Sequence, residues 1–208
     1  MKNRVNIFRS ASVTFMLALF ISAVLSIGLI SCKSSEKGSD RASINTSVNV
    51  VITEAEVSQA QQAWGEGIVK IGEVYKSGGD YKAAATEHIN NFYNYQEGTV
   101  LFKPTLVSQK QFRLDFDGAL SYFIAGDSSY PEDHGFAIKP WSSVRWENVE
   151  TKIVGGVALA MGNYYFTPVA GGDEVKVEYS FAYVKDREGK LKIILHDSRI
   201  PYSPADKH

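Results

Sequence analysis

Cysteine is almost absent from this sequence: Cys32 is the single thiol among 208 residues. One thiol excludes an intramolecular disulfide and a zinc site built from several cysteines. Acidic and basic side chains nearly cancel to a formal net charge of −1, so no nucleic-acid partner is indicated. The sequence also lacks G-x-G-x-x-G, the P-loop, H-E-x-x-H and G-x-S-x-G. Common nucleotide, metalloprotease and serine-hydrolase sites are therefore not indicated.

The N-terminal region has the pattern of a lipoprotein export signal. Three basic and no acidic residues occur among the first nine, and an apolar run covers 13–30. The run ends in Leu-Ile-Ser before Cys32, which is typical of a lipobox. We predict a signal peptide at 1–31, a lipidated Cys32 and a flexible tether at 32–52. The protein would be lipid-anchored in the bacterial cell envelope, facing the periplasm or the exterior. The alternative is an ordinary transmembrane anchor.

Helical patterns follow the tether. Thr53 and Glu56 form a capping box, and apolar residues recur every three or four positions over 57–75. A second, shorter helix is expected over 81–92. Aromatic and leucine spacing predicts a third helix over 111–125.

The C-terminal half is typical of strands. Alternation of apolar and polar side chains is clearest over 173–185. The expected strands are 99–102, 144–150, 156–166, 173–185 and 190–202. Helices followed by strands indicate an α+β fold. We predict one domain, 53–203, with helices packed on a strongly curved antiparallel sheet, and a C-terminal tail at 204–208.

The last expected strand carries two chemically useful side chains. Strict alternation would assign its residues to two faces: Leu191, Ile193 and Leu195 on one, and Ile194, His196 and Ser198 on the other. An imidazole and a hydroxyl would then stand side by side where Pro201 ends the pairing. This pair is a candidate reaction centre, and a histidine with a purely structural hydrogen bond is the alternative.

Several ordered motifs resemble the iota-class carbonic anhydrases, whose fold is the NTF2-like cone shared with the association domain of calmodulin-dependent kinase. The resemblance covers about 55–202. The motifs are Leu-Phe-Lys-Pro-Thr ending at Thr105, Ala-Leu-Ser-Tyr-Phe containing Tyr122, Pro-Glu-Asp-His-Gly-Phe-Ala from Pro131, Ala-Leu-Ala-Met-Gly-Asn-Tyr-Tyr-Phe ending at Phe166, and His-Asp-Ser-Arg-Ile-Pro from His196.

The resemblance implies reversible hydration of carbon dioxide to bicarbonate. It implies that the hydroxyls of Thr105, Tyr122 and Ser198 bind the substrate, and that His196 orients a water or moves its proton. The family's ending usually reads His-His-Ser-Ser, whereas this chain has Asp197 after the histidine. By alternation the Asp197 carboxylate should point away from the bicarbonate site.

The residues favour a site without metal. A zinc site needs three or four suitable ligands, and this chain offers only four histidines and no available thiol. We therefore expect no cofactor, with zinc or manganese as the alternative, since both kinds of member are described in the family.

Other functions remain open at this stage. An NTF2-like cone can serve as a small-ligand binding module or as an assembly module without catalysis. An isomerase or hydratase of this fold usually needs an acidic base, and none is expected in the pocket. A homodimer formed through the sheets is compatible with catalysis.

Overall fold

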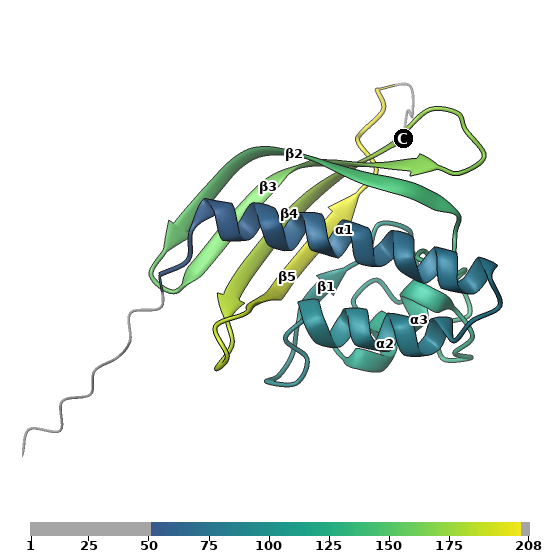
Figure 1. Cartoon of the computed structure of the whole chain (residues 1–208), viewed down its shortest axis with the longest axis horizontal. Coiled ribbons are helices and arrows are strands. Elements are labelled where there is room, and N and C mark those ends of the chain that lie inside the picture. The colour runs from purple at the N-terminus through teal and green to yellow at the C-terminus, as the bar shows by residue number, and fades with distance from the viewer. Residues whose placement is uncertain (1–50, 205–208) are drawn as a thin grey trace, which may run out of the picture. The chain divides into compact units, whose positions relative to one another are not determined.

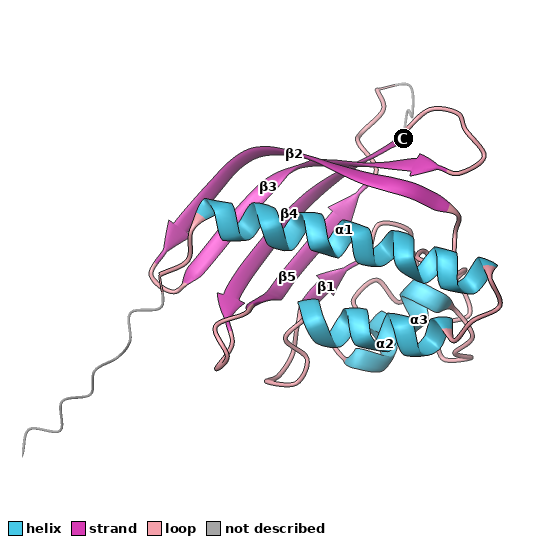
Figure 2. Cartoon of the chain, in the orientation of Figure 1, coloured by secondary structure: helices cyan, strands magenta, loops and turns pink. Residues whose placement is uncertain are grey.

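The computed structural model describes residues 51–204. The predicted signal peptide, Cys32, nearly all of the tether and residues 205–208 lie outside the described residues. The described part contains three helices and a five-stranded sheet (Figures 1 and 2). Helix α1 lies across one face of the curved sheet, and α2 and α3 lie beside its β1 edge (Figure 1). This is the α+β architecture that the sequence predicts.

Helix α1 spans Glu54–Lys76 and begins at the expected capping box. The Glu56 backbone N–H donates to the Thr53 hydroxyl at 3.2 Å, and the Thr53 backbone N–H donates to the Glu56 carboxylate at 2.8 Å. These bonds satisfy donors that the first turn leaves free. Most of the predicted apolar stripe is buried, with Trp64 and Ile68 in the core, but its last residue, Tyr75, is 46% exposed.

Helix α2 spans Tyr81–Phe92 and follows a tight turn after α1. Gly78 in that turn has φ +72°, which favours glycine because it lacks a Cβ. The Asp80 carboxylate accepts the N–H of Ala83 and so caps α2. None of the helices within residues 51–204 is both long and apolar enough to cross a membrane.

Helix α3 spans Phe116–Ile124 and is shorter than predicted. The Asp115 carboxylate caps its first turn. The segment before it is not helical, because Arg113 donates its backbone N–H to the carbonyl of Phe102 at 2.8 Å. Phe112 therefore lies outside the helix and is exposed. The helical spacing of Phe112 and Phe116 predicted that the helix starts near Phe112. The backbone pairing of Arg113 with Phe102 prevents this.

The sheet has the order β1-β5-β4-β3-β2. Its strands are β1 (Leu101–Lys103), β2 (Trp141–Val154), β3 (Val157–Pro168), β4 (Val175–Lys185) and β5 (Leu191–Arg199). Strands β2 to β5 are antiparallel, as predicted, and β1 adds a parallel edge beside β5. The functional consequence is that β1 and the residues after it lie next to the end of β5.

A β-bulge changes the faces of β5. Tyr183 pairs with Ile193, whereas the preceding Ala182 pairs with Leu195, so Ile194 is an extra residue. Ile193 is consequently buried on the same face as His196. The predicted assignment of Leu191 and Ile193 to the face opposite His196 was therefore wrong. The predicted placement of His196 and Ser198 on one inward face was right.

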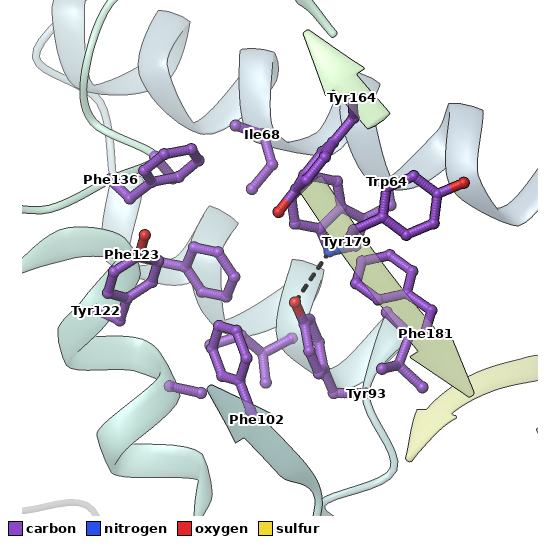
Figure 3. Packing of buried hydrophobic residues seen from close by; sticks show 14 of the residues in the cluster. Trp64, Ile68, Tyr93, Phe102, Tyr122, Phe123, Phe136, Tyr164, Tyr179 and Phe181 are labelled. Carbon is purple, nitrogen blue, oxygen red and sulfur yellow. Dashed lines mark hydrogen bonds between the residues drawn. The ribbon is translucent and has the colours of Figure 1, made fainter. Parts of the chain in front are cut away.

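Aromatic side chains dominate the core between α1 and the sheet (Figure 3). Trp64 lies near the centre, with Phe181 at 6.3 Å and Tyr164 at 6.0 Å between ring centroids. Edge-to-face contacts of this kind add to the burial of apolar surface. The core also buries His196 and Ser198, so the candidate site is built into its wall.

Candidate active site

Thr105 and Ser198 meet although 93 residues separate them. The parallel register of β1 and β5 pairs Phe102 with His196 and Lys103 with Asp197. Thr105 follows directly after β1 and therefore reaches Ser198. Their hydroxyl oxygens lie 2.8 Å apart, which is a hydrogen bond. Thr105 is half-buried and Ser198 is buried, so this hydroxyl pair reaches from the core toward the surface.

The His196 imidazole is held on both nitrogens. Its Nδ1 lies 2.9 Å from the hydroxyl of Tyr93, and its Nε2 lies 3.3 Å from the hydroxyl of Tyr164. The ring stacks on Phe102 with centroids 4.7 Å apart and meets the edge of Phe181 at 4.1 Å. The imidazole therefore has one defined orientation in the core.

The electrostatic surroundings keep His196 neutral. Burial lowers the pKa of His196 well below its usual value, and the positive charge of Lys103 lowers it further. Burial disfavours the charged form of any imidazole, because the low-dielectric core solvates charge poorly. His196 is thus an uncharged donor and acceptor at neutral pH.

Tyr164 connects the imidazole to the hydroxyl pair. It lies on β3, and its side chain is buried on the inward face. Burial raises the pKa of Tyr164, and the nearby hydroxyls of Ser198 and Thr105 partly oppose that increase. The Tyr164 hydroxyl thus stays protonated between His196 and the Thr105–Ser198 pair.

Tyr122 enters from α3. Its ring stacks on Phe136 and meets the edge of Phe102, with centroids 5.6 and 5.8 Å away. The buried Tyr122 hydroxyl makes no hydrogen bond with the described residues. Burial raises its pKa, and the backbone N–H of Leu106 and the hydroxyl of Thr105 are near enough to oppose this without reaching hydrogen-bond geometry. Tyr122 therefore has a free hydroxyl beside Thr105.

Asp197 points away from the hydroxyl cluster, as alternation predicted. Its carboxylate lies 3.9 Å from the Lys103 ammonium and 4.0 Å from the Arg199 guanidinium. The Lys103 ammonium also donates to the backbone carbonyl of Ser198 at 2.8 Å. Lys103 thus bonds the backbone of Ser198 and also partly neutralises the Asp197 carboxylate.

The segment that carries Thr105 is fastened by Glu132. The Glu132 carboxylate accepts backbone N–H groups from Ser108, Gln109 and Lys110 at 2.7 to 3.1 Å. These bonds lower the pKa of Glu132 to about 2, since each favours the ionised carboxylate. The loop is therefore ordered across neutral pH.

A buried ion pair fixes the other end of the same segment. Arg113 lies 2.6 Å from Asp133, and both side chains are completely buried. The second oxygen of Asp133 accepts the hydroxyl of Ser121 at 2.6 Å. Ser121 precedes Tyr122 on α3, so this network links the Thr105 segment to the helix that carries Tyr122.

A large surface groove lies elsewhere. It has a volume of about 850 Å³ and is lined by α1 and β2 residues, including Gln61, Glu66 and Arg145. It contains none of the four predicted site residues. Size alone would favour this groove. The inner cluster is nevertheless the better reaction site, because it combines several buried hydroxyls with a neutral imidazole.

The histidines are dispersed. His134 lies exposed in a loop, and His88 is buried on α2, where neither ring nitrogen is hydrogen-bonded to a described residue. A Cβ added to Gly67 would lie 2.3 Å from the His88 ring, so this glycine allows the close packing. Within residues 51–204 no three His, Cys, Asp or Glu side chains gather as metal ligands.

His88 should make stability depend on pH. Burial lowers the pKa of His88 to about 3, whereas an unfolded histidine titrates near 6.5. Between these values the unfolded chain binds a proton that the folded chain does not, so the free energy of unfolding falls as the pH is lowered. We expect His88→Leu to reduce that slope by about 1.4 kcal/mol per pH unit in urea denaturation between pH 6 and 4. An unchanged slope would contradict this assignment.

Sequence reasoning missed two residues of the site. Tyr164 was given no role beyond its place in the motif that ends at Phe166, and Tyr93 was not singled out. The inward alternation of Tyr164 with Phe166 was visible in the sequence. Its contact with His196 depends on the pairing of β3, β4 and β5. The four predicted residues, Thr105, Tyr122, His196 and Ser198, do come together in one region.

Comparison with known proteins identifies the family. A family model of metal-independent carbonic anhydrases matches residues 55–200. A metal-independent carbonic anhydrase of Nostoc sp. (strain PCC 7120) is 44% identical over 158 residues, covering 74% of this chain and 77% of the relative. The crystal structure of the iota-carbonic anhydrase from a cyanobacterium, complexed with bicarbonate, has a TM-score of 0.72 and 43% identity. The match covers 74% of this chain and 96% of that one.

The fold and the site define an NTF2-like enzyme whose polar centre is made of hydroxyls and one imidazole. The chain belongs to the family of metal-independent carbonic anhydrases, the iota class, which interconvert carbon dioxide and bicarbonate. This assignment confirms the predicted activity. It also confirms the prediction of no metal cofactor over the zinc or manganese alternative.

Proposed function

We propose that carbon dioxide is hydrated at the cluster of Thr105, Tyr122, His196 and Ser198. The observation that carries this proposal is the meeting of the Thr105 and Ser198 hydroxyls at 2.8 Å, beside the unbonded hydroxyl of Tyr122. Substrate oxygens would replace the Thr105–Ser198 hydrogen bond and accept from the hydroxyls instead. The half-buried Thr105 gives the route from solvent.

The chemistry follows from where charge develops. The oxygen of water forms a bond to the carbon of carbon dioxide, and one C=O π pair moves onto an oxygen. One proton leaves the water, so the products are bicarbonate and a proton. Donors held near the charged oxygens stabilise the transition state, each by about 3 kcal/mol in a dry site. Thr105, Tyr122 and Ser198 would supply these donors.

Two further observations support an anion at this place. The cyanobacterial relative was solved in complex with bicarbonate, and we transfer that ligand to this cluster as part of the proposal. The Lys103 ammonium, bonded to the Ser198 backbone carbonyl at 2.8 Å, places a positive charge whose field reaches His196 and lowers its pKa. An anion is attracted by such a charge in a site of reduced dielectric.

A chelator tests the metal-free character of this chemistry. Stopped-flow measurements on the purified chain should show carbon dioxide hydration at an unchanged rate after EDTA treatment, because hydroxyl side chains supply the electrostatics. Addition of zinc or manganese should not raise the rate. Activity that disappears with chelator and returns with metal would contradict the proposal.

We infer that the protein is lipid-anchored through Cys32 in the bacterial cell envelope, facing the periplasm or the exterior. The lipobox before Cys32 and the basic start of the chain support this. Several lipid chains on one cysteine would give stable membrane attachment. The wild-type chain should incorporate radioactive palmitate in cells and Cys32→Ser should not, and equal labelling of the two would argue against the anchor.

We also propose a homodimer formed through the outer faces of the sheets. Leu159 and Met161 of β3 point away from the core and are about half exposed, and Val149 of β2 is more exposed still. Apolar side chains on a strand face favour packing against a second copy. Light scattering should report a dimer that Met161→Glu dissociates, and a monomeric native protein would refute it.

A further inference from the structure

Trp64 determines which groups donate and which accept in the hydrogen bonds around His196. The indole Nε1–H can only donate, and it donates to the Tyr93 hydroxyl at 3.1 Å (Figure 3). The Tyr93 hydroxyl oxygen is thereby used as an acceptor. Its own proton has one acceptor within the described residues, His196 Nδ1 at 2.9 Å. Tyr93 therefore donates to His196.

The donor in the Tyr93–His196 hydrogen bond also determines which nitrogen of the imidazole carries the proton. A neutral imidazole has one N–H, and its other nitrogen accepts. Since Nδ1 accepts from Tyr93, the proton is on Nε2, which lies 3.3 Å from the Tyr164 hydroxyl oxygen. The lowered pKa of His196 excludes the doubly protonated ring at neutral pH.

The orientation of the ring is itself defined. A 180° flip would exchange both nitrogens for carbons and leave the hydroxyls of Tyr93 and Tyr164 facing C–H groups. Buried hydroxyls without partners cost free energy, so the observed orientation is preferred. Phe102 and Phe181 hold the ring plane between these two hydroxyls.

The tautomer of His196 restricts where the Tyr164 hydroxyl can donate its proton. Its oxygen receives the His196 N–H, so its own proton cannot point back to that nitrogen. Within the described residues the Tyr164 hydroxyl makes no other hydrogen bond, and the nearby hydroxyls of Ser198 and Thr105 partly offset the rise in its pKa. The Tyr164 proton is therefore left available to a substrate oxygen bound beside Ser198 and Thr105.

We propose that Tyr164 is a further catalytic residue, a fourth hydroxyl donor to the substrate, and that Trp64 and Tyr93 are positioning residues that act through His196. His196 then orients Tyr164 and does not take the proton of the water directly. This inference rests on the proposed function of the Thr105–Ser198 cluster.

The tautomer of His196 can be measured directly. In the purified full chain labelled with 15N-histidine, long-range 1H–15N spectra should show His196 with an unprotonated Nδ1 and a protonated Nε2. The four histidines of the chain can be assigned by substitution. A wild-type His196 protonated on Nδ1 would overturn the inference, whatever the variants do.

Three tyrosine-to-phenylalanine variants test the roles. Tyr164→Phe should lower kcat about a hundredfold without changing the His196 tautomer, because it removes a substrate donor. Tyr93→Phe should mix the two tautomers and lower kcat about tenfold. Tyr183→Phe is the matched control, since it removes a buried hydroxyl that has no hydrogen-bond partner among residues 51–204, and it should leave the tautomer and kcat unchanged.

The outcomes separate this inference from the proposed function. Full kcat in Tyr164→Phe, together with a large loss in Ser198→Ala, would overturn the role of Tyr164 and leave the site in place. Full kcat in both variants would overturn the site as well. An Nε2-protonated tautomer that persists in Tyr93→Phe would overturn the positioning role of Tyr93.

Discussion

Ser198→Ala is expected to lower kcat for carbon dioxide hydration about a hundredfold to a thousandfold, the cost of losing one preorganised donor to a charged transition state. The fold should tolerate the change. The Ser198 backbone still pairs with Tyr179, and its carbonyl still accepts the Lys103 ammonium. Thr105 loses one hydrogen bond but is half-buried, so the stability cost is about 1 kcal/mol. Stopped-flow kinetics and urea denaturation of the same preparation separate the two effects.

A matched serine on the same sheet controls for this result. Ser180 lies on β4 and pairs through its backbone with Asp197, on the face away from the hydroxyl cluster. Ser180→Ala should retain wild-type kcat. Tyr122→Phe, which removes another proposed donor, should resemble Ser198→Ala. Full activity in both Ser198→Ala and Tyr122→Phe would rule out this cluster as the site of hydration.

Local signals allowed much of the fold to be predicted. Helix α1 has a capping box at Thr53 and an apolar stripe, both of which depend only on neighbouring residues. Strand β4 showed a clear alternation and occupies Val175–Lys185, close to the expected range. Helix α3 began later than expected, because Arg113 pairs with the β1 strand through a backbone contact that no local pattern encodes.

The site could be predicted only in part. The motif resemblance gave Thr105, Tyr122, His196 and Ser198, and alternation correctly turned Asp197 away from them. Tyr93 and Tyr164 contact His196, although they lie 103 and 32 residues away from it in the sequence. Sequence spacing therefore does not indicate their roles. The bulge at Ile194 likewise depends on how β4 and β5 pair.

Asp133 is another residue whose importance is hidden in the sequence, where it lies between Glu132 and His134 in a polar loop. In the structure its buried carboxylate pairs with the completely buried Arg113 at 2.6 Å. Asp133→Asn would leave the buried guanidinium with only the Glu132 carboxylate, 4.0 Å away, as its counter-charge. We expect the free energy of unfolding to fall by about 3 kcal/mol in urea denaturation, because a poorly compensated buried charge is costly.

A double-mutant cycle distinguishes the buried charge from a general loss of packing. Arg113→Met removes the charge that Asp133 compensates, so Arg113→Met/Asp133→Asn should be clearly less destabilised than the sum of the two single variants. The exposed pair Arg145–Glu174, 2.7 Å apart, is the control, and Glu174→Gln should cost no more than about 1 kcal/mol. Additive losses in the cycle would show that the ion pair is not what joins the Thr105 segment to α3. A coupled loss would mean that this one buried ion pair fixes the relative position of two proposed hydroxyl donors, Thr105 and Tyr122. The link to Tyr122 runs through Ser121, whose hydroxyl donates to Asp133.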